Sequence, residues 1–341
     1  MNKLILISLI ASLYQVEVDA HGYMTFPIAR QRRCSAAGGN WYPVGGGGIQ
    51  DPMCRAAYQN VFNKVLNANG GDVIDASEAA NYMYTQDNEY AALAGPDYTN
   101  ICHIQQRVVP SYLCAGGASD WSIRPFGDKS GMDLPGSWTP TIIQLSDNQQ
   151  SNVVMELEFC PTAVHDPSYY EVYITNPSFN VYTDNVVWAN LDLIYNNTVT
   201  LRPKLPESTC AANSMVYRFE VSIPVRPSQF VLYVRWQRID PVGEGFYNCV
   251  DMKFKYSEGP DEEDIIEPEY EVDNEAECFA YRTNSGNVNV NPLQENKYMA
   301  YANKAIRNIN THSNGCSRNR NNKNNYNKYY SKTYNYNQNR K

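Results

Sequence analysis

The stretches QFVLYVRWQ (residues 229–237) and FYNCVDMKFKY (residues 246–256) decide the fold of this chain. Both are rich in Val, Tyr and Phe, and a segment with proline and glycine separates them, which is typical of neighbouring strands. Four further apolar or alternating runs precede them, at residues 152–160, 169–175, 186–193 and 215–222. Six short strands at this spacing predict a mainly β fold, an antiparallel β-sandwich of the immunoglobulin or fibronectin III type.

The chain before this sandwich has a different composition. Residues 21–138 are rich in Gly, Pro, Tyr and Cys and contain few clear strands, which predicts a loop- and helix-containing insertion. Cys54–Leu66 is expected to form one helix. A second helix is expected to be capped by Asp75 or Ser77 and to run through Ala92. Long ordered loops of this sort usually carry a binding surface.

The first twenty residues have the layout of a secretory signal peptide. Lys3 supplies the positive start, an apolar run follows, and small residues precede the expected cut after Ala20. The apolar run is too short to span a bilayer, so we expect no integral membrane segment. Cleavage would leave His21 as the first residue, whose α-amine and ring nitrogen can close on one metal ion. We therefore expect the protein in the secretory pathway and outside the cell.

Composition and cysteine usage agree with an extracellular protein. The 341-residue chain has a formal net charge of −8, which argues against nucleic acid as a partner. Its nine cysteines contain no CxxC pair and predict a disulfide framework. Its connectivity cannot be deduced from the sequence, apart from an expected Cys34–Cys54 bond. The sequon that begins at Asn196 predicts N-glycosylation there.

The end of the chain changes character again. Residues 258–277 hold eleven Asp or Glu and no Lys or Arg, whereas residues 317–341 are dominated by Asn, Tyr, Lys and Arg. Two disordered stretches are the favoured interpretation, with a largely extended tail over residues 258–341. The alternative is that these opposite charges attract neighbouring molecules, in which case Cys278 and Cys316 are candidates for intermolecular disulfides.

Only four histidines occur in the sequence, at positions 21, 103, 165 and 312. His165 lies in CPTAVHD (residues 160–166), in the turn between two predicted strands. A histidine in such a turn is usually a surface residue. His21 at a new N-terminus makes it a candidate second metal ligand.

Three motifs together resemble the chitin-active lytic polysaccharide monooxygenases. They are HGY at residues 21–23, TAVH at residues 162–165 followed by YIT at residues 173–175, and FY at residues 246–247. Their order and spacing are more specific than any one of them. The resemblance covers residues 21–257, and it implies a copper-dependent domain that oxidatively cleaves chitin.

The resemblance also implies a role for individual residues. His21 would give its amine and Nδ1, and His165 its Nε2, to one copper ion, in the tetragonal arrangement that Cu(II) prefers. Phe246 matches an aromatic residue on one axial side, and Ala163 a small residue on the other. By itself, Phe246 would be read as an ordinary core residue. The family's acidic or amide group near the metal cannot be placed, because the region before Pro140 departs from the bacterial pattern.

Within this family, the spindle-forming proteins of insect poxviruses are the most similar in layout. That similarity implies disruption of the chitin lining of the insect gut, enhanced infection, and self-association into dimers and crystals in vesicles of the endoplasmic reticulum. Two alternatives are a non-catalytic chitin-binding module and a purely structural crystal-forming protein. A glycosidase would need two opposed carboxylates, and the setting of Asp166 and Glu171 gives no reason to pair them.

Overall fold

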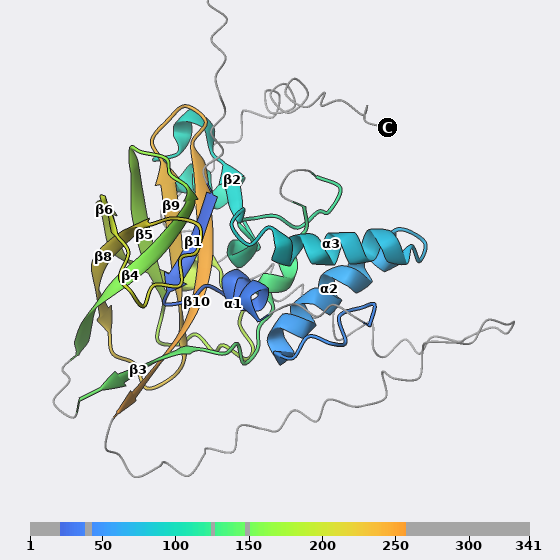
Figure 1. Cartoon of the computed structure of the whole chain (residues 1–341), viewed down its shortest axis with the longest axis horizontal. Helices are drawn as coiled ribbons and strands as arrows, with labels where there is room; N and C mark the ends of the chain where they lie inside the picture. The colour runs from blue at the N-terminus through green and yellow to red at the C-terminus, as the bar shows by residue number, and fades with distance from the viewer. Residues whose placement is uncertain (1–20, 38–42, 124–126, 147–150, 257–341) are drawn as a thin grey trace, which may run out of the picture. The chain divides into compact units, whose positions relative to one another are not determined.

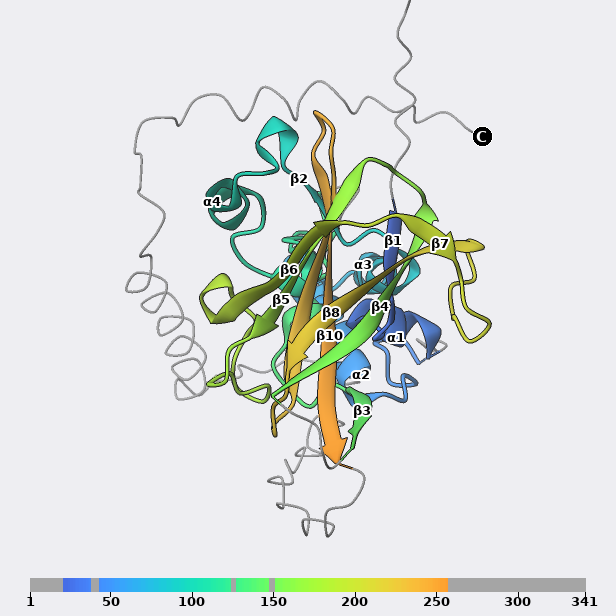
Figure 2. The same ribbon diagram turned by 90° about the vertical axis from the view of Figure 1, so that its left-hand side faces the viewer.

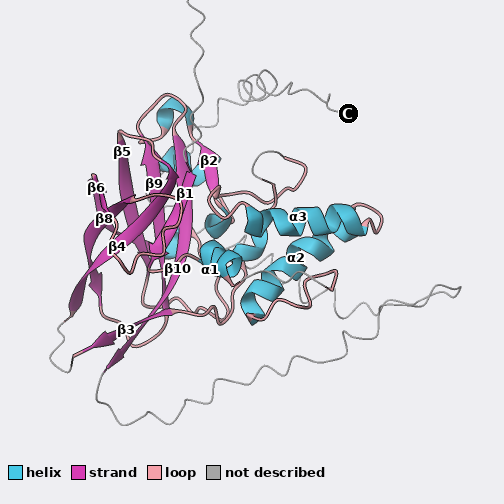
Figure 3. Ribbon diagram, in the orientation of Figure 1, coloured by secondary structure: helices cyan, strands magenta, loops and turns pink. Residues whose placement is uncertain are grey.

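The computed structural model describes residues 21–37, 43–123, 127–146 and 151–256. Figure 1 shows two β-sheets packed against each other, with helices α1, α2 and α3 gathered on one side of them. The separation of strands from helices is clearest in Figure 3. The expected signal peptide, the extended tail and the two tail cysteines all lie outside the described residues.

Strands are the largest class of regular secondary structure in the described chain. They are β1 (His21–Phe26), β2 (Ala91–Leu93), β3 (Thr141–Leu145), β4 (Asn152–Ala163), β5 (Ser168–Thr175), β6 (Leu191–Thr198), β7 (Leu201–Pro203), β8 (Met215–Pro224), β9 (Phe230–Arg238) and β10 (Glu244–Tyr256). The α-helices are α1 (Arg30–Ala36), α2 (Pro52–Ala68), α3 (Val73–Thr85) and α4 (Ile101–His103), and Ile104–Val108 forms a π-helical turn. Short 3-10 turns occupy Gly95–Asp97, Leu113–Ala115, Ser130–Asp133 and Trp188–Asn190. No helix in these described ranges is both long and apolar enough to cross a membrane.

The two sheets confirm the predicted antiparallel sandwich. One has the strand order β1-β4-β8-β7, and the other has the order β2-β10-β9-β5-β6. Figure 2 views the sandwich from the side on which β4 and β8 lie in front of β10. One ladder departs from the prediction, because β3 pairs with β10 in parallel. The likeness to immunoglobulin-type sandwiches therefore holds, with one added parallel edge strand.

The strand predicted at residues 186–193 is wrong. Trp188–Asn190 is a 3-10 turn, and β6 begins only at Leu191 and runs to Thr198. The Asn190 side chain causes the turn, because its Oδ1 accepts from the Val187 amide at 3.0 Å and its Nδ2 donates to the Asn185 carbonyl at 3.0 Å. Such local side-chain bonds compete with a strand ladder.

The second predicted helix exists, but its bounds and its cap are wrong. The helix starts at Val73, where the Asp72 carboxylate accepts from two backbone amides at 2.8 and 3.1 Å, so Asp72 rather than Asp75 or Ser77 is the cap. It ends at Thr85, well before Ala92. The chain leaves the helix because Ala91–Leu93 instead forms β2, paired with β10.

Two separate cores explain why β9 and β10 read as almost continuously apolar. Between the sheets, Leu232, Trp236 and Phe246 belong to one buried cluster. Side chains on the other face of the same two strands, such as Tyr233 and Tyr247, belong to a second cluster with α2 and α3. All nine residues of β9 are therefore buried. A sheet covered on both faces loses the alternation that marks a half-exposed strand.

Disulfides join the helical region to the sandwich. Cys34–Cys54, which was expected, links α1 to α2. Cys114–Cys249 ties the 3-10 turn at residues 113–115 to β10, and Cys160–Cys210 fastens the end of β4. A buried ion pair supports the same contact, since the Arg30 Nε of α1 lies 2.7 Å from the Asp251 carboxylate of β10.

Candidate metal centre

His21 is the first residue of β1, and the β1–β4 ladder fixes its place. In that antiparallel ladder His21 lies opposite Ala163, the last residue of β4. At the next position, Gly22, strand β1 lies very close to strand β4. A Cβ atom added to Gly22 would lie 2.4 Å from the Phe159 ring and 2.6 Å from the Cys160 carbonyl oxygen. Glycine is therefore required here, because no side chain fits between the two strands.

Phe246 brings β10 to the same place. Its side chain is fully buried, and its ring centroid lies 6.2 Å from that of His21 in an edge-on arrangement. Phe246 also packs on Trp236 of β9, with centroids 5.1 Å apart. The ring thus serves as a core residue and is also a neighbour of His21, while its axial position at a copper ion stays a prediction. His21, Ala163 and Phe246, predicted from three distant motifs, come together in the structure.

His165 lies in the loop between β4 and β5, as predicted. Ala163 precedes it by two residues, which span at most about 7 Å of chain, so its backbone lies at the same end of the sandwich as His21. The His165 Nε2 atom lies 2.8 Å from an Arg238 guanidinium nitrogen and 3.4 Å from the Asp240 carboxylate. Its Nδ1 atom is buried and has no hydrogen-bond partner among the described residues.

The surroundings of His165 favour its neutral form. Burial lowers the pKa of the imidazole, and the nearby Arg238 guanidinium lowers this pKa further, although Asp240 and Asp166 oppose the effect. A neutral imidazole is the form that binds a metal ion, because the lone pair must be free of a proton. The ring therefore reaches its ligand form at a lower pH than an isolated histidine would.

Arg238 connects His165 to two carboxylates that the sequence did not single out. Its guanidinium contacts Asp240 at 2.8 Å and Glu244 at 2.7 Å, and its side chain is 9% exposed. These three residues surround the hairpin loop between β9 and β10. Charges in such a loop are usually solvated, so only their position next to a candidate ligand could have marked them. Asp240 supplies an acidic group next to His165, and Glu244 is joined to that histidine through Arg238.

The two carboxylates weighed for a glycosidase have separate hydrogen-bond partners. Asp166 accepts hydrogen bonds from Tyr217 at 2.9 Å and Ser168 at 3.2 Å. Glu171 instead pairs with the buried Arg235 at 2.9 Å and accepts from Tyr173 at 2.9 Å. Each carboxylate is thus held by its own structural partners, and they do not form the opposed pair that hydrolysis needs.

The donor set present at this end of the sandwich fits copper. Among the described residues there is no group of three or more His, Cys, Asp and Glu able to hold a metal ion. The predicted centre needs only two histidines, with a terminal amine as the third donor. Imidazole suits copper, and the His165 Nε2 atom lies 2.8 Å from the Arg238 guanidinium, a group that only donates, so this nitrogen presents its lone pair. His103 is not part of this group, since its Nε2 contacts the Ala94 carbonyl oxygen at 3.1 Å.

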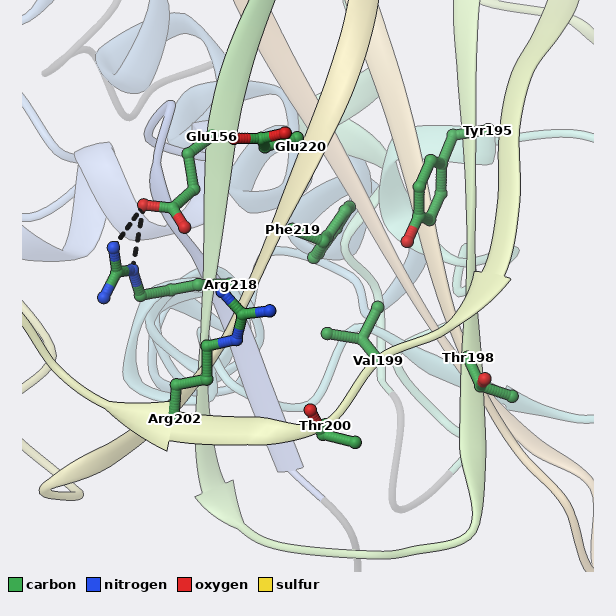
Figure 4. Close-up of a pocket in the computed structure, with 9 residues that line it drawn as sticks. All are labelled: Glu156, Tyr195, Thr198, Val199, Thr200, Arg202, Arg218, Phe219 and Glu220. Atoms are coloured by element: carbon green, nitrogen blue, oxygen red, sulfur yellow. Dashed lines mark hydrogen bonds and ion pairs between the residues drawn. The ribbon is translucent and has the colours of Figure 1, made fainter.

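A separate groove lies elsewhere on the sandwich. It has a volume of about 390 Å³ and is bordered by β4, β6, β7 and β8. Figure 4 shows the Arg218 guanidinium turned toward Glu156, with Arg202 and Tyr195 on other sides of the groove. None of the predicted metal-site residues lines it. The predicted glycosylation residue Asn196 is exposed on the neighbouring strand β6, at the edge of its sheet.

Comparison with known proteins places the chain in a family. Residues 21–252 match the family model described as lytic polysaccharide mono-oxygenase, cellulose-degrading. The chain is 99% identical to spindolin of Choristoneura biennis entomopoxvirus over the full length of both chains. Together these matches show that the chain belongs to the lytic polysaccharide mono-oxygenase family.

Solved structures of relatives agree with this family assignment. Fusolin spindles of Wiseana spp. entomopoxvirus share 62% identity with the chain, at a TM-score of 0.68, with 85% of this chain and 99% of that one covered. An entomopoxvirus fusolin in complex with zinc shares 55% identity, at a TM-score of 0.69, with 86% and 95% covered. That second structure is described as a basis for enhanced virulence and for crystallisation into viral spindles in vivo. The expected kinship with spindle-forming poxvirus proteins is thereby confirmed.

Proposed function

We propose that the mature protein binds one copper ion through His21 and His165 and cleaves chitin oxidatively. The observation that carries this proposal is the placing of His21 at the start of β1, opposite Ala163 and edge-on to Phe246. The family membership supports the same reaction class, and the zinc complex of a relative supports metal binding.

Each residue has a separate task in this proposal. His21 offers its α-amine and Nδ1 after cleavage at Ala20, and His165 offers Nε2 once that atom exchanges its contact with Arg238 for the ion. Asp240 and Glu244 hold the displaced guanidinium. Phe246 keeps water from one side of the site, and the small Ala163 leaves room on the other. Bound copper would supply the one-electron chemistry needed to attack a sugar C–H bond, which acid–base groups alone cannot do.

Chitin is the proposed substrate, although the family model carries the description cellulose-degrading. The choice rests on the resemblance of the three motifs to chitin-active members and on the virulence that is ascribed to a relative. An insect virus meets chitin, in the lining of the host gut, as a barrier to infection. Disruption of this lining is the proposed contribution to infection.

Secretion, glycosylation and assembly complete the proposal. Residues 1–20 would direct the chain to the secretory pathway and would be removed there, and Asn196 on the exposed strand β6 would carry an N-linked glycan. Accumulation in vesicles of the endoplasmic reticulum and release outside the cell would follow. Dimers and crystals would form through residues 258–341, with Cys278 and Cys316 as candidate links between chains.

A one-residue extension at the N-terminus tests the copper site. Protein that begins at His21 should bind one copper ion in a titration and, with reductant and peroxide, should release oxidised oligosaccharides from chitin and fewer from cellulose. Protein with one alanine before His21 should bind copper at least about 100-fold more weakly, since loss even of groups that only orient ligands costs 10–100-fold.

The outcomes separate the alternatives. Equal copper affinity and equal product release with the extra residue would contradict the proposed ligand set. Binding to chitin without any oxidised product from either protein would favour the non-catalytic binding module.

Crystal assembly is a second proposed function, favoured by the spindle structures of relatives. Protein truncated after residue 257 should form no spindles in producing cells, while its soluble form keeps copper binding and chitin oxidation. Microscopy of the cells and an assay of the purified protein measure the two properties separately. Spindles that persist after truncation would show that the described domain assembles by itself.

A further inference from the structure

One short segment contacts all three strands that carry the candidate site. Residues 87–91, here called the clamp segment, connect α3 to β2. The backbone carbonyl of Asn88 accepts a hydrogen bond from the Gly22 amide at 3.0 Å. Gly22 directly follows His21, so this bond fixes the strand that presents the first ligand.

The same residue reaches the strand that leads to the second ligand. The Asn88 side-chain amide donates to the Thr162 hydroxyl oxygen at 3.2 Å, and both residues are half-buried. Thr162 directly precedes Ala163 and lies three positions before His165. Asn88 therefore links β1 and β4 through two different groups, its backbone carbonyl and its side chain.

The third contact reaches the strand of Phe246. The carbonyl of Tyr90 accepts from the Tyr247 amide at 2.8 Å, and Ala91 pairs with Phe246 itself in the β2–β10 ladder. These contacts of the clamp segment with β1, β4 and β10 thus fall on a site residue or on its immediate neighbour.

The clamp segment is itself held in place by buried charge. The ammonium group of Lys129 is fully buried, donates to the Glu89 carbonyl, and lies 4.7 Å from the centre of the Tyr90 ring. The Tyr82 hydroxyl donates to the Glu89 carboxylate at 2.7 Å. Arg32 pairs with Asp87 at 3.0 Å. A segment anchored at successive residues can transmit its position to the strands that it touches.

We propose that Asn88 is a positioning residue, which sets the separation of His21 and His165 by clamping β1 to β4 through Gly22 and Thr162. This inference rests on the proposed copper site and adds a residue that acts on its geometry without binding the ion. Groups that orient metal ligands usually contribute 10–100-fold to metal affinity. Asn88 acts one step further from the ion, because it bonds to Gly22, which follows His21, and to Thr162, three positions before His165.

A double-mutant cycle tests the clamp in mature protein that begins at His21. Asn88→Ala and Thr162→Val each remove the side-chain hydrogen bond, and each should weaken Cu(II) affinity by about 10-fold. The double variant should lose no more than either single variant, because both remove one shared interaction. The copper hyperfine splitting in the electron paramagnetic resonance spectrum should change in the same way in all three. In metal-free protein, the Gly22 amide should exchange its hydrogen faster.

A matched control separates positioning from general destabilisation. Asn81→Ala removes a comparable amide contact, the 3.0 Å hydrogen bond from Tyr58, which joins α3 to α2 and involves none of the candidate site residues. This variant should keep the wild-type copper affinity and spectrum even where its melting temperature falls. If Asn88→Ala does not fold, Thr162→Val, with its nearly equal volume, carries the test.

The outcomes distinguish the inference from the proposed function. Suppose that wild-type protein binds copper and that the Asn88 and Thr162 variants have the same affinity and spectra. This result would overturn the positioning role of Asn88 and leave the proposed copper site intact. Strictly additive losses in the double variant would also overturn it, since the two side chains would then act independently. Wild-type protein that binds no copper would overturn the proposed function, and the positioning role with it.

Discussion

Mature protein with His165→Ala should bind copper at least about 100-fold more weakly than wild type and release no oxidised oligosaccharides from chitin. The expected loss exceeds the 10–100-fold that follows removal of a group that only orients a ligand, because a ligand itself is removed. Only the amine and ring of His21 would remain as donors. A competition titration with a chelator of known affinity, run beside the product assay, measures both effects.

His103→Ala is the matched control for this variant. It removes a histidine ring of the same kind, which contacts the Ala94 carbonyl and none of the candidate site residues. Copper affinity and product release should remain at the wild-type level. Near wild-type affinity in His165→Ala, with the protein folded, would show that the second ligand lies elsewhere and that the family resemblance misplaces the site.

Gly22→Ala should both destabilise the protein and disturb the copper site. The added methyl group would lie 2.6 Å from the Cys160 carbonyl oxygen and 2.4 Å from the Phe159 ring, and a backbone atom in a ladder cannot move aside alone. We expect the free energy of unfolding to fall by about 1–3 kcal/mol, the usual cost of overpacking. We also expect copper affinity to fall at least about 10-fold as β1 shifts with His21. Denaturant unfolding and a copper titration provide the measurements.

Gly47→Ala offers a comparison at a glycine outside the site. Its added methyl group would meet only the Pro43 side chain, at 3.3 Å, and its backbone needs no left-handed conformation. Stability should change by no more than about 0.5 kcal/mol, as for most surface substitutions, and copper affinity should not change. Wild-type stability and affinity in Gly22→Ala would mean that β1 can move away from β4 without moving the ligand.

Five of the six predicted strands are present, because each carries enough Val, Tyr and Phe to mark it locally. The misplaced sixth strand shows where such reasoning fails, since the bonds of a single Asn190 side chain turn the chain just before β6. The short strands β1 and β2 escaped prediction for a different reason. Each gains its ladder only from a partner far away in sequence, β4 for one and β10 for the other.

The candidate site, like the fold, was predicted only in part from the sequence. The motifs predicted His21, His165, Ala163 and Phe246, and the structure brings three of these together and places His165 in the adjoining loop. Arg238 and the clamp segment were not predicted, because an arginine at a strand end and an asparagine after a helix are ordinary residues. Their importance comes only from tertiary contacts with the neighbours of the ligands.

The position of β1 also bears on the order in which this protein is made. The strand is the first part of the mature chain to leave the ribosome, yet it pairs with β4 and its Met24 amide donates to the Asn248 side chain at 3.1 Å. Contacts so distant in sequence slow folding, because a long loop must close before they form. The leading strand can therefore form its ladder only after β4 has been synthesised, and its bond to Asn248 only when the end of the domain is present.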